Sequence, residues 1–200
     1  MSARIDFYFD FSSSYSYVSL PRVQQISSEY DVTVAWKPIV LGAIFKSLGH
    51  APPSAGSIKM QYMNRDLERC AEAAGLPPFV HPESFPFNSI SASRVFWHLQ
   101  QAAGEAAAIE WAQSVFGEAF AKGRDCSDPA VLGDVATRLG HDADALLAAT
   151  SDEAVKARLK EVTGEAMERG VFGAPTFYFD GEIYWGGDRL AHIARLLDHS

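Results

Sequence analysis

Residues Ile5 to Ser19 read IDFYFDFSSSYSYVS, and this stretch decides the fold. The segment from Ile5 to Phe9 is an aromatic and apolar run of the length that is typical of a buried β-strand. Three serines follow it, and the residues after them favour a helix. Hydroxyl groups at such a junction lie at a helix N-terminus, where unpaired N–H groups and a partial positive charge stabilise a nucleophile or an anion. Serine also caps helices without any further role, and this stretch alone favours capping.

The composition limits the classes of partner. The chain has 200 residues, of which 17 are basic and 25 acidic, with a formal net charge of −8. This balance argues against a nucleic acid or an anionic membrane as the main partner. The N-terminus lacks a signal-peptide pattern, and no apolar run is long enough to cross a membrane. The two cysteines, Cys70 and Cys126, form neither a metal motif nor a disulfide framework. We therefore expect a reduced, cytoplasmic protein.

The remaining elements are predicted in three blocks. A helix over residues 14–29, which Pro21 should kink or split, leads to a strand over 32–36, so the chain begins with a βαβ unit. Residues 37–169 show almost no strand pattern. The helices expected there span 57–74, 88–101, 106–122, 130–139, 142–149 and 151–169.

Strands return near the C-terminus. Residues 176–179 and 183–185 have the composition of strands, and Asp180-Gly181 between them predicts a tight hairpin turn. A last helix is expected over 189–197. The outline is a βαβ unit, a long helical block and an αββα unit, which indicates two half-domains separated by a helical insertion.

The sequence Gly173-Ala174-Pro175-Thr176 precedes the first of these late strands. A proline at this place is a candidate for a cis peptide bond, which would expose the backbone of Ala174 to an extended peptide-like ligand. The trans form is far commoner for an X–Pro bond in general, so both states stay open here.

Taken together, these features resemble the DsbA-like thioredoxin proteins. The Cys-x-x-Cys that a disulfide oxidoreductase needs is missing, and Ser13 stands at the position of its first cysteine. This version of the junction resembles the 2-hydroxychromene-2-carboxylate isomerases and the kappa-class glutathione transferases. The resemblance covers nearly the whole chain and rests on FDFSSSYSY (9–17), on Lys59, Tyr62-Met63 and Asp66-Leu67, on FGAPT (172–176) and on WGGDRL (185–190).

The resemblance implies an α/β protein with a thioredoxin-like fold and a large all-helical insertion. The thioredoxin-like domain would comprise residues 1–37 and 165–200, and the inserted helical domain residues 38–164. The cofactor would be glutathione, with the Ser13 hydroxyl facing its sulfur. A free thiol is largely protonated at pH 7, and a hydrogen bond to the thiolate together with a helix N-terminus lowers its pKa. Two departures from the family bear on this role: Ser14 stands where proline is usual, and Ser12 where an apolar residue is usual.

The same resemblance implies further contacts. The backbone of Ala174, before Pro175, would pair with the cysteinyl part of glutathione, and Gly187 and Asp188 would hold its γ-glutamyl end. Each of the other candidates has a structural alternative: a helix cap for Asp188, a solvated lysine for Lys59, a surface histidine for His50 and a core tryptophan for Trp185. The candidate glutathione ligands also include His50 and Lys59, and the candidate substrate contacts are Trp185, Asn88 and Tyr62.

Three functions remain open on this basis. The first is a glutathione-dependent isomerase of 2-hydroxychromene-2-carboxylate or a related aromatic carboxylate, in which glutathione is regenerated. The second is a kappa-like glutathione transferase, in which glutathione is consumed. The third is a non-catalytic thioredoxin-fold protein that binds peptides beside Pro175. Relatives suggest a homodimer.

Overall fold

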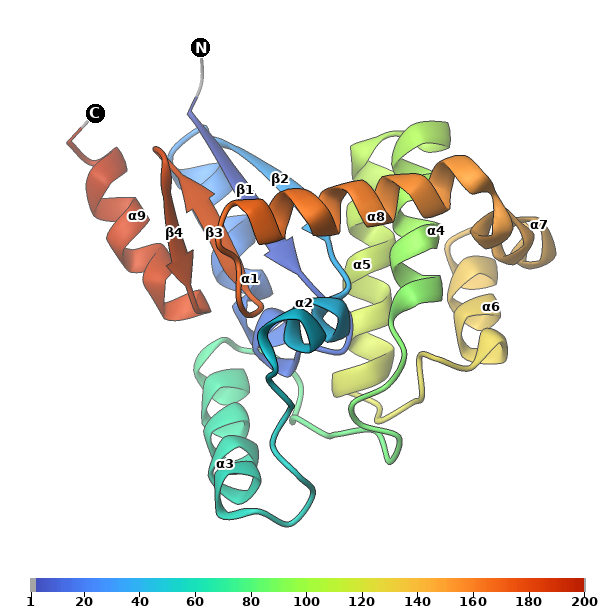
Figure 1. Ribbon diagram of the computed structural model, residues 1–200, viewed down its shortest axis with the longest axis horizontal. Coiled ribbons are helices and arrows are strands. Elements are labelled where there is room, and N and C mark those ends of the chain that lie inside the picture. The colour runs from blue at the N-terminus through green and yellow to red at the C-terminus, as the bar shows by residue number, and fades with distance from the viewer. Residues whose placement is uncertain (1–2, 200) are drawn as a thin grey trace.

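The computed structural model describes residues 3–199 and is built on a mixed four-stranded sheet (Figure 1). The strand order is β2-β1-β3-β4. Strand β1 (Arg4–Phe9) pairs parallel with β2 (Thr33–Pro38) and antiparallel with β3 (Thr176–Phe179), which pairs antiparallel with β4 (Glu182–Trp185). The predicted strands and the hairpin are therefore confirmed.

The helices fall into three groups: one that connects β1 to β2, a set inserted between β2 and β3, and one that follows β4. Helix α1 (Ser14–Glu29) links β1 to β2 and is continuous across Pro21, so the alternative that Pro21 splits it is wrong. After β4, the 3₁₀ turn η2 (Gly187–Arg189) leads to α9 (Leu190–Leu197). The insertion between β2 and β3 comprises α2 (Leu41–Leu48), α3 (Ile58–Ala73), α4 (Ile90–Ala103), α5 (Glu105–Phe120), α6 (Pro129–Arg138), α7 (Ala143–Ala148), the 3₁₀ turn η1 (Ala149–Ser151) and α8 (Glu153–Glu168).

Helix α2 is the element that the sequence analysis missed. It is only eight residues long, and Val40 at its N-cap offers no side-chain hydrogen bond. A short helix without a polar cap gives no start pattern in the sequence.

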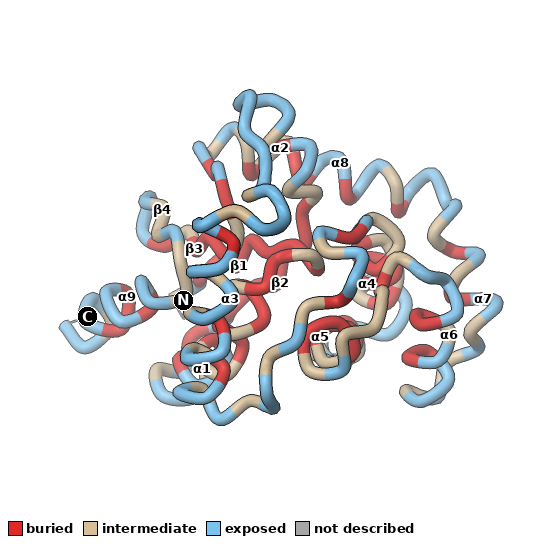
Figure 2. Tube along the Cα trace, turned by 90° about the horizontal axis from the view of Figure 1, so that it is seen from below, coloured by how far each residue is buried: buried red, intermediate tan, exposed pale blue. Residues whose placement is uncertain are grey.

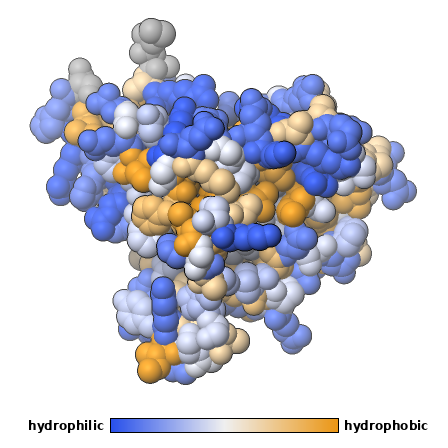
Figure 3. All heavy atoms as spheres, in the orientation of Figure 1, coloured by the Kyte–Doolittle hydropathy of each residue, from blue (hydrophilic) through white to orange (hydrophobic). Residues whose placement is uncertain are grey.

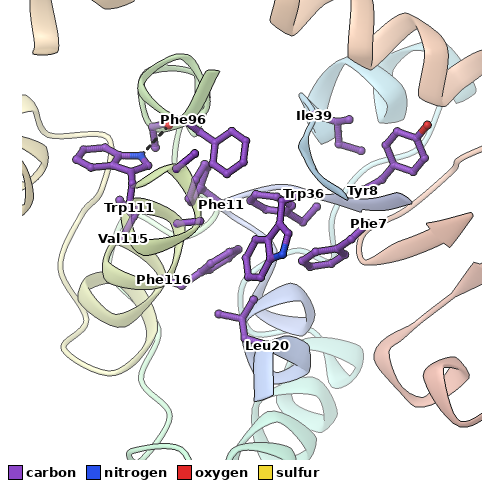
Figure 4. Packing of buried hydrophobic residues seen from close by; sticks show 14 of the residues in the cluster. Phe7, Tyr8, Phe11, Leu20, Trp36, Ile39, Phe96, Trp111, Val115 and Phe116 are labelled. Carbon is purple, nitrogen blue, oxygen red and sulfur yellow. Dashed lines mark hydrogen bonds between the residues drawn. The ribbon is translucent and has the colours of Figure 1, made fainter. Parts of the chain in front are cut away.

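One face of the sheet joins the insertion to the strands. Strand residues alternate between the two faces of a sheet, so Phe7 and Phe9 point to the same side. The Phe9 ring lies 5.8 Å from the Phe96 ring of α4 and 5.7 Å from the Phe116 ring of α5, centroid to centroid. Figure 4 shows this aromatic cluster, with Trp36 beside Phe7. The apolar core therefore runs without a break from the sheet into the helices, and the boundaries predicted for two domains stay a prediction.

The other face carries an ion-pair network beneath α8. Lys37 Nζ of β2 lies 2.9 Å from Asp6 Oδ2 of β1 and 3.0 Å from Glu165 Oε1 of α8. Arg169, just after α8, contacts both carboxylates, at 2.7 Å and 2.9 Å. Burial opposes ionisation of Asp6, but hydrogen bonds from Lys37, Arg4 and Arg169 outweigh it and lower its pKa. The network anchors the last insertion helix to the sheet.

The distribution of burial agrees with these layers (Figure 2). Buried residues follow β1, β2 and the inner sides of α1 and α5, while the outer surfaces of α2, α3 and α6 are exposed. Within residues 3–199, no helix is long and apolar enough to span a bilayer.

Candidate active site

The buried Ser13 lies at the N-cap of α1, at the junction of β1 and the helix. Its Oγ accepts a hydrogen bond from Ser16 N at 3.2 Å, as a capping serine does. The same hydroxyl donates to the carbonyl oxygen of Ala174 at 2.9 Å, across 161 residues of sequence. Capping and a contact with the loop before β3 therefore occur together, and the structure brings Ser13 and Ala174 to one point.

Asp10 fixes the turn that carries Ser13. Asp10 is 1% exposed, and its Oδ1 accepts hydrogen bonds from Ser12 N at 2.7 Å and Ser12 Oγ at 2.8 Å. Its Oδ2 accepts from Leu41 N, the first residue of α2, at 2.8 Å. Its carbonyl oxygen accepts from Ser13 N at 2.8 Å. Asp10 thus connects β1, the serine turn and the insertion, and the sequence analysis did not single it out.

The three neighbouring serines differ in their surroundings. Ser12 directs its hydroxyl to Asp10, whereas Ser13 directs its hydroxyl to the Ala174 loop. Ser14 is the first residue of α1 and is almost fully buried. Of the three, Ser13 has the hydroxyl that meets the loop from the opposite half of the fold.

The loop before β3 holds the half-buried Ala174 between the buried residues Gly173 and Pro175. The Ala174–Pro175 bond is cis, which decides the question that the sequence left open. The Pro175 carbonyl accepts from Gly186 N at 2.9 Å, and Thr176 Oγ1 donates to the Gly173 carbonyl at 2.7 Å, so both ends of the loop are tied. Within residues 3–199, Ala174 N donates no hydrogen bond. The Ala174 N–H is therefore open to a partner strand or peptide, while its carbonyl already accepts one hydrogen bond from Ser13 Oγ.

Turn η2 packs on α1 beyond Ser13. A Cβ placed on Gly187 would lie 2.7 Å from Ser19 Cβ, so this close approach admits only glycine. Ser19 follows Ser13 by six residues, a rise of about 9 Å along a helix. The Gly187-Asp188 segment therefore lies against α1 about 9 Å along the helix from Ser13, and the Asp188 carboxylate there is 71% exposed.

An exposed aromatic pair borders the same loop. The Trp185 ring is 4.9 Å from the Phe172 ring, and Trp185 is 55% exposed. A Cβ on Gly173 would lie 2.5 Å from Trp185 Nε1, so the indole lies directly over the loop backbone. On the face shown in Figure 3, apolar side chains gather where α2 and the segment before β3 lie. Trp185 is therefore a surface tryptophan rather than a core one, and Phe172 is its unpredicted neighbour.

Helix α3 approaches the site with its C-terminal half. Tyr15 of α1 donates from its hydroxyl to Asp66 Oδ2 of α3 at 2.9 Å. Burial raises the pKa of the Cys70 thiol, and the negative charges of Asp66 and Asp188 raise it further, so this half of α3 lies near η2. Lys59 and Tyr62 are exposed on the N-terminal half, and Lys59 precedes Asp66 by about two helical turns.

His50 and Asn88 lie on loops of the insertion. His50 is exposed just after α2, where its ring lies 6.5 Å from that of Phe45. The exposed Asn88 accepts a hydrogen bond from Ile90 N at 3.0 Å through Oδ1, which serves the start of α4. In residues 3–199 neither side chain hydrogen-bonds to Ser13 or Ala174. Their predicted ligand contacts stay predictions.

The profile of the DSBA-like thioredoxin domain matches residues 4–198 of this chain. The chain belongs to the DsbA-like thioredoxin family. Within that family, it is 32% identical over 188 residues to 2-hydroxychromene-2-carboxylate isomerase of Pseudomonas putida, covering 93% of this chain and 90% of the relative. A solved structure of a 2-hydroxychromene-2-carboxylate isomerase superposes with a TM-score of 0.85 and 31% identity, covering 98% of this chain and 95% of the other.

Glutathione S-transferase kappa 1 of Caenorhabditis elegans is a more distant relative of this DsbA-like chain. It is 26% identical over 206 residues, covering 97% of this chain and 90% of the relative. The expected fold and the expected family are confirmed, and the chain is a 2-hydroxychromene-2-carboxylate isomerase-like enzyme.

Proposed function

We propose that this enzyme is a glutathione-dependent cis-trans isomerase that converts 2-hydroxychromene-2-carboxylate, or a related aromatic catabolite, to a product such as trans-o-hydroxybenzylidenepyruvate. The observation that carries the proposal is the contact of Ser13 Oγ with the Ala174 carbonyl at a helix N-terminus. A hydroxyl, the start of a helix and the N–H of Ala174, unpaired within the described part of the chain, lie near one another there, which supports the proposal. The names of the relatives supply the substrate class.

Each candidate residue has a defined task in this proposal. Glutathione, when bound, would supply a thiolate for reversible addition to the conjugated substrate, so that the ring could open and the former double bond could rotate before the thiolate leaves. Ser13 Oγ donates to the sulfur, and the N-terminus of α1 adds a favourable field, so both lower the thiol pKa. The Ala174 N–H and C=O hold the cysteinyl backbone. Asp188 meets the γ-glutamyl ammonium group, and Lys59 or His50 meets a carboxylate.

The substrate would lie against the aromatic border of the site. Trp185 and Phe172 present apolar rings beside the loop that holds Ala174. Such rings suit a flat aromatic acid, because stacking adds to the burial of apolar area. Tyr62 and Asn88 complete the candidate substrate contacts. The proposal also includes a homodimer in the cytoplasm.

A kappa-like glutathione transferase is the second candidate, because the kappa transferases are relatives over almost the whole chain. It would use the same thiolate site but release a glutathione conjugate. The third candidate, a binding protein without catalysis, needs the free backbone of Ala174 and no thiolate.

Turnover with sub-stoichiometric glutathione separates the three functions. The purified protein is mixed with 2-hydroxychromene-2-carboxylate and less glutathione than substrate, and product and free thiol are followed together. The isomerase forms more product than the glutathione present and leaves the free thiol constant. Loss of one thiol per substrate molecule indicates the transferase. If the protein neither turns over the substrate nor binds glutathione, it is the binding protein.

A further inference from the structure

The hydroxyl of Ser16 is buried without a hydrogen-bond partner within residues 3–199. Two other buried helix serines are paired: Ser19 Oγ donates to the Ser16 carbonyl at 2.7 Å, and Ser93 Oγ donates to the Ser89 carbonyl at 2.9 Å. A buried hydroxyl without a partner has lost its hydration and gained nothing in return. Such an orphaned group at a functional site calls for a partner that forms in another state of the protein.

The position of Ser16 identifies this partner. Ser16 follows Ser13 by three residues, which is the spacing of Cys-x-x-Cys motifs, and its N–H already donates to Ser13 Oγ at 3.2 Å. Side chains on a helix lean toward its N-terminus, so the Ser16 side chain leans toward the turn that holds Ser13. Rotation about the single χ1 torsion of Ser16 can then turn its hydroxyl toward Ser13 Oγ.

The hydrogen-bond capacity of Ser13 leaves one place for this donor. A serine hydroxyl has one proton and two lone pairs. The Ser13 proton is donated to the Ala174 carbonyl, and one lone pair accepts the Ser16 N–H. The second lone pair has no partner within residues 3–199. To serve a ligand's sulfur, the Ser13 proton has to turn from the Ala174 carbonyl, and a backbone N–H of the ligand can take its place there.

We propose that Ser16 is a positioning residue whose hydroxyl donates to Ser13 Oγ when a thiolate binds. With both lone pairs of Ser13 occupied, its single proton can point only outward, toward the sulfur or the Ala174 carbonyl. A hydroxyl that accepts hydrogen bonds is also a stronger donor, because the bonds in a chain polarise one another. Ser16 therefore acts on the thiolate through Ser13, since its own oxygen is screened from the surface. This inference rests on the proposed glutathione site.

The test compares Ser16→Ala with wild type and with Ser93→Ala, which removes a buried helix hydroxyl that is already paired. Two quantities are measured: the pKa of the bound glutathione thiol, from thiolate absorbance against pH, and the midpoint of urea unfolding without glutathione. In Ser16→Ala the thiol pKa rises by about 0.5–1 unit, equivalent to a roughly three- to tenfold loss of thiolate below that pKa. Its unfolding midpoint stays the same or increases, because an orphaned hydroxyl has been removed.

The control variant Ser93→Ala should show the opposite pattern in the two measured quantities. Ser93→Ala lowers the unfolding midpoint and leaves the thiol pKa unchanged. An unchanged thiol pKa in Ser16→Ala would overturn the role of Ser16, and so would a loss of stability equal to that of Ser93→Ala. A wild-type protein that shows no bound thiolate would instead overturn the glutathione site itself, so the two failures are distinct.

Discussion

Replacement of Asp10 by asparagine tests whether a carboxylate is required to hold the serine turn against the insertion. In the native protein one oxygen of Asp10 serves Ser12 N and Oγ, and the other serves Leu41 N. Asparagine is nearly the same size but has a single acceptor oxygen. It can satisfy Ser12 or Leu41, but its NH₂ group then faces an N–H donor on the other side.

The cost follows from the burial of this group. A buried backbone N–H left without a partner costs about 1–3 kcal/mol, and the remaining hydrogen bonds weaken because the acceptor loses its charge. We therefore expect Asp10→Asn to lower the free energy of unfolding by about 2–4 kcal/mol. The assay is equilibrium unfolding in urea, with the slope compared between variants to verify that the same surface is exposed.

Asp125→Asn is a matched control. Asp125 Oδ1 accepts from Ser127 N at 2.9 Å and from Ser127 Oγ at 2.7 Å, the same pattern as at Asp10, before another capped helix. Its further partner is the Ser84 hydroxyl, which can reverse its hydrogen bond to accept from an amide. Asp125→Asn should cost less than about 1 kcal/mol. Equal losses at the two sites would refute the argument from Leu41 N.

Three other substitutions test separate parts of the structure. Lys37→Met removes the buried partner of Asp6, which keeps its contacts with Arg4 and Arg169, and should cost about 1–2 kcal/mol in urea unfolding. Burial lowers the pKa of His81, whose ring nitrogens have no partner in residues 3–199, so the unfolded chain binds more protons below about pH 6.5. Stability should therefore fall from pH 7 to pH 5, and less in His81→Leu. Gly187→Ala pushes against Ser19 and should weaken glutathione binding measured by calorimetry, about tenfold or more.

Each of these expectations has a contrary result. If Lys37→Met lowers the free energy of unfolding by less than about 1 kcal/mol, the network contributes no more to stability than an exposed ion pair does. The same pH dependence in wild type and His81→Leu would assign the acid sensitivity to other groups. Unchanged glutathione affinity in Gly187→Ala would remove η2 from the binding site.

Local sequence patterns were enough to predict most of the helices and strands. The aromatic run of β1 and the serines after it predicted the strand, the helix start and a capping serine, because these depend on neighbours in the chain. Pro21 did not split α1, although proline removes a helix hydrogen bond. Buried side chains on both sides of it, Leu20 and Val23, hold the helix in place, so tertiary packing outweighs the local preference.

The parts that sequence analysis missed or left open depend on partners distant in the chain. The anchoring role of Asp10 depends on its hydrogen bond from Leu41 N, which lies 31 residues further along the chain. The cis bond at Pro175 is the less common form of an X–Pro bond, so local statistics favour the trans form. Phe172 belongs to the site because Trp185 lies against it. The orphaned hydroxyl of Ser16 becomes visible only when every hydrogen bond near it has been assigned. Two Asp-x-Ser turns before capped helices, at Asp10 and Asp125, were the one local pattern that pointed to such an anchor.

Ultraviolet difference titration with glutathione tests the central claim most directly. Wild-type protein at neutral pH should show a thiolate band that saturates with glutathione, and Ser13→Ala should lose the band while it still folds. Ser12→Ala is the control, because the Ser12 hydroxyl is directed to Asp10. A band that survives in Ser13→Ala would contradict the assignment of Ser13, and no band in wild type would contradict the glutathione site as a whole.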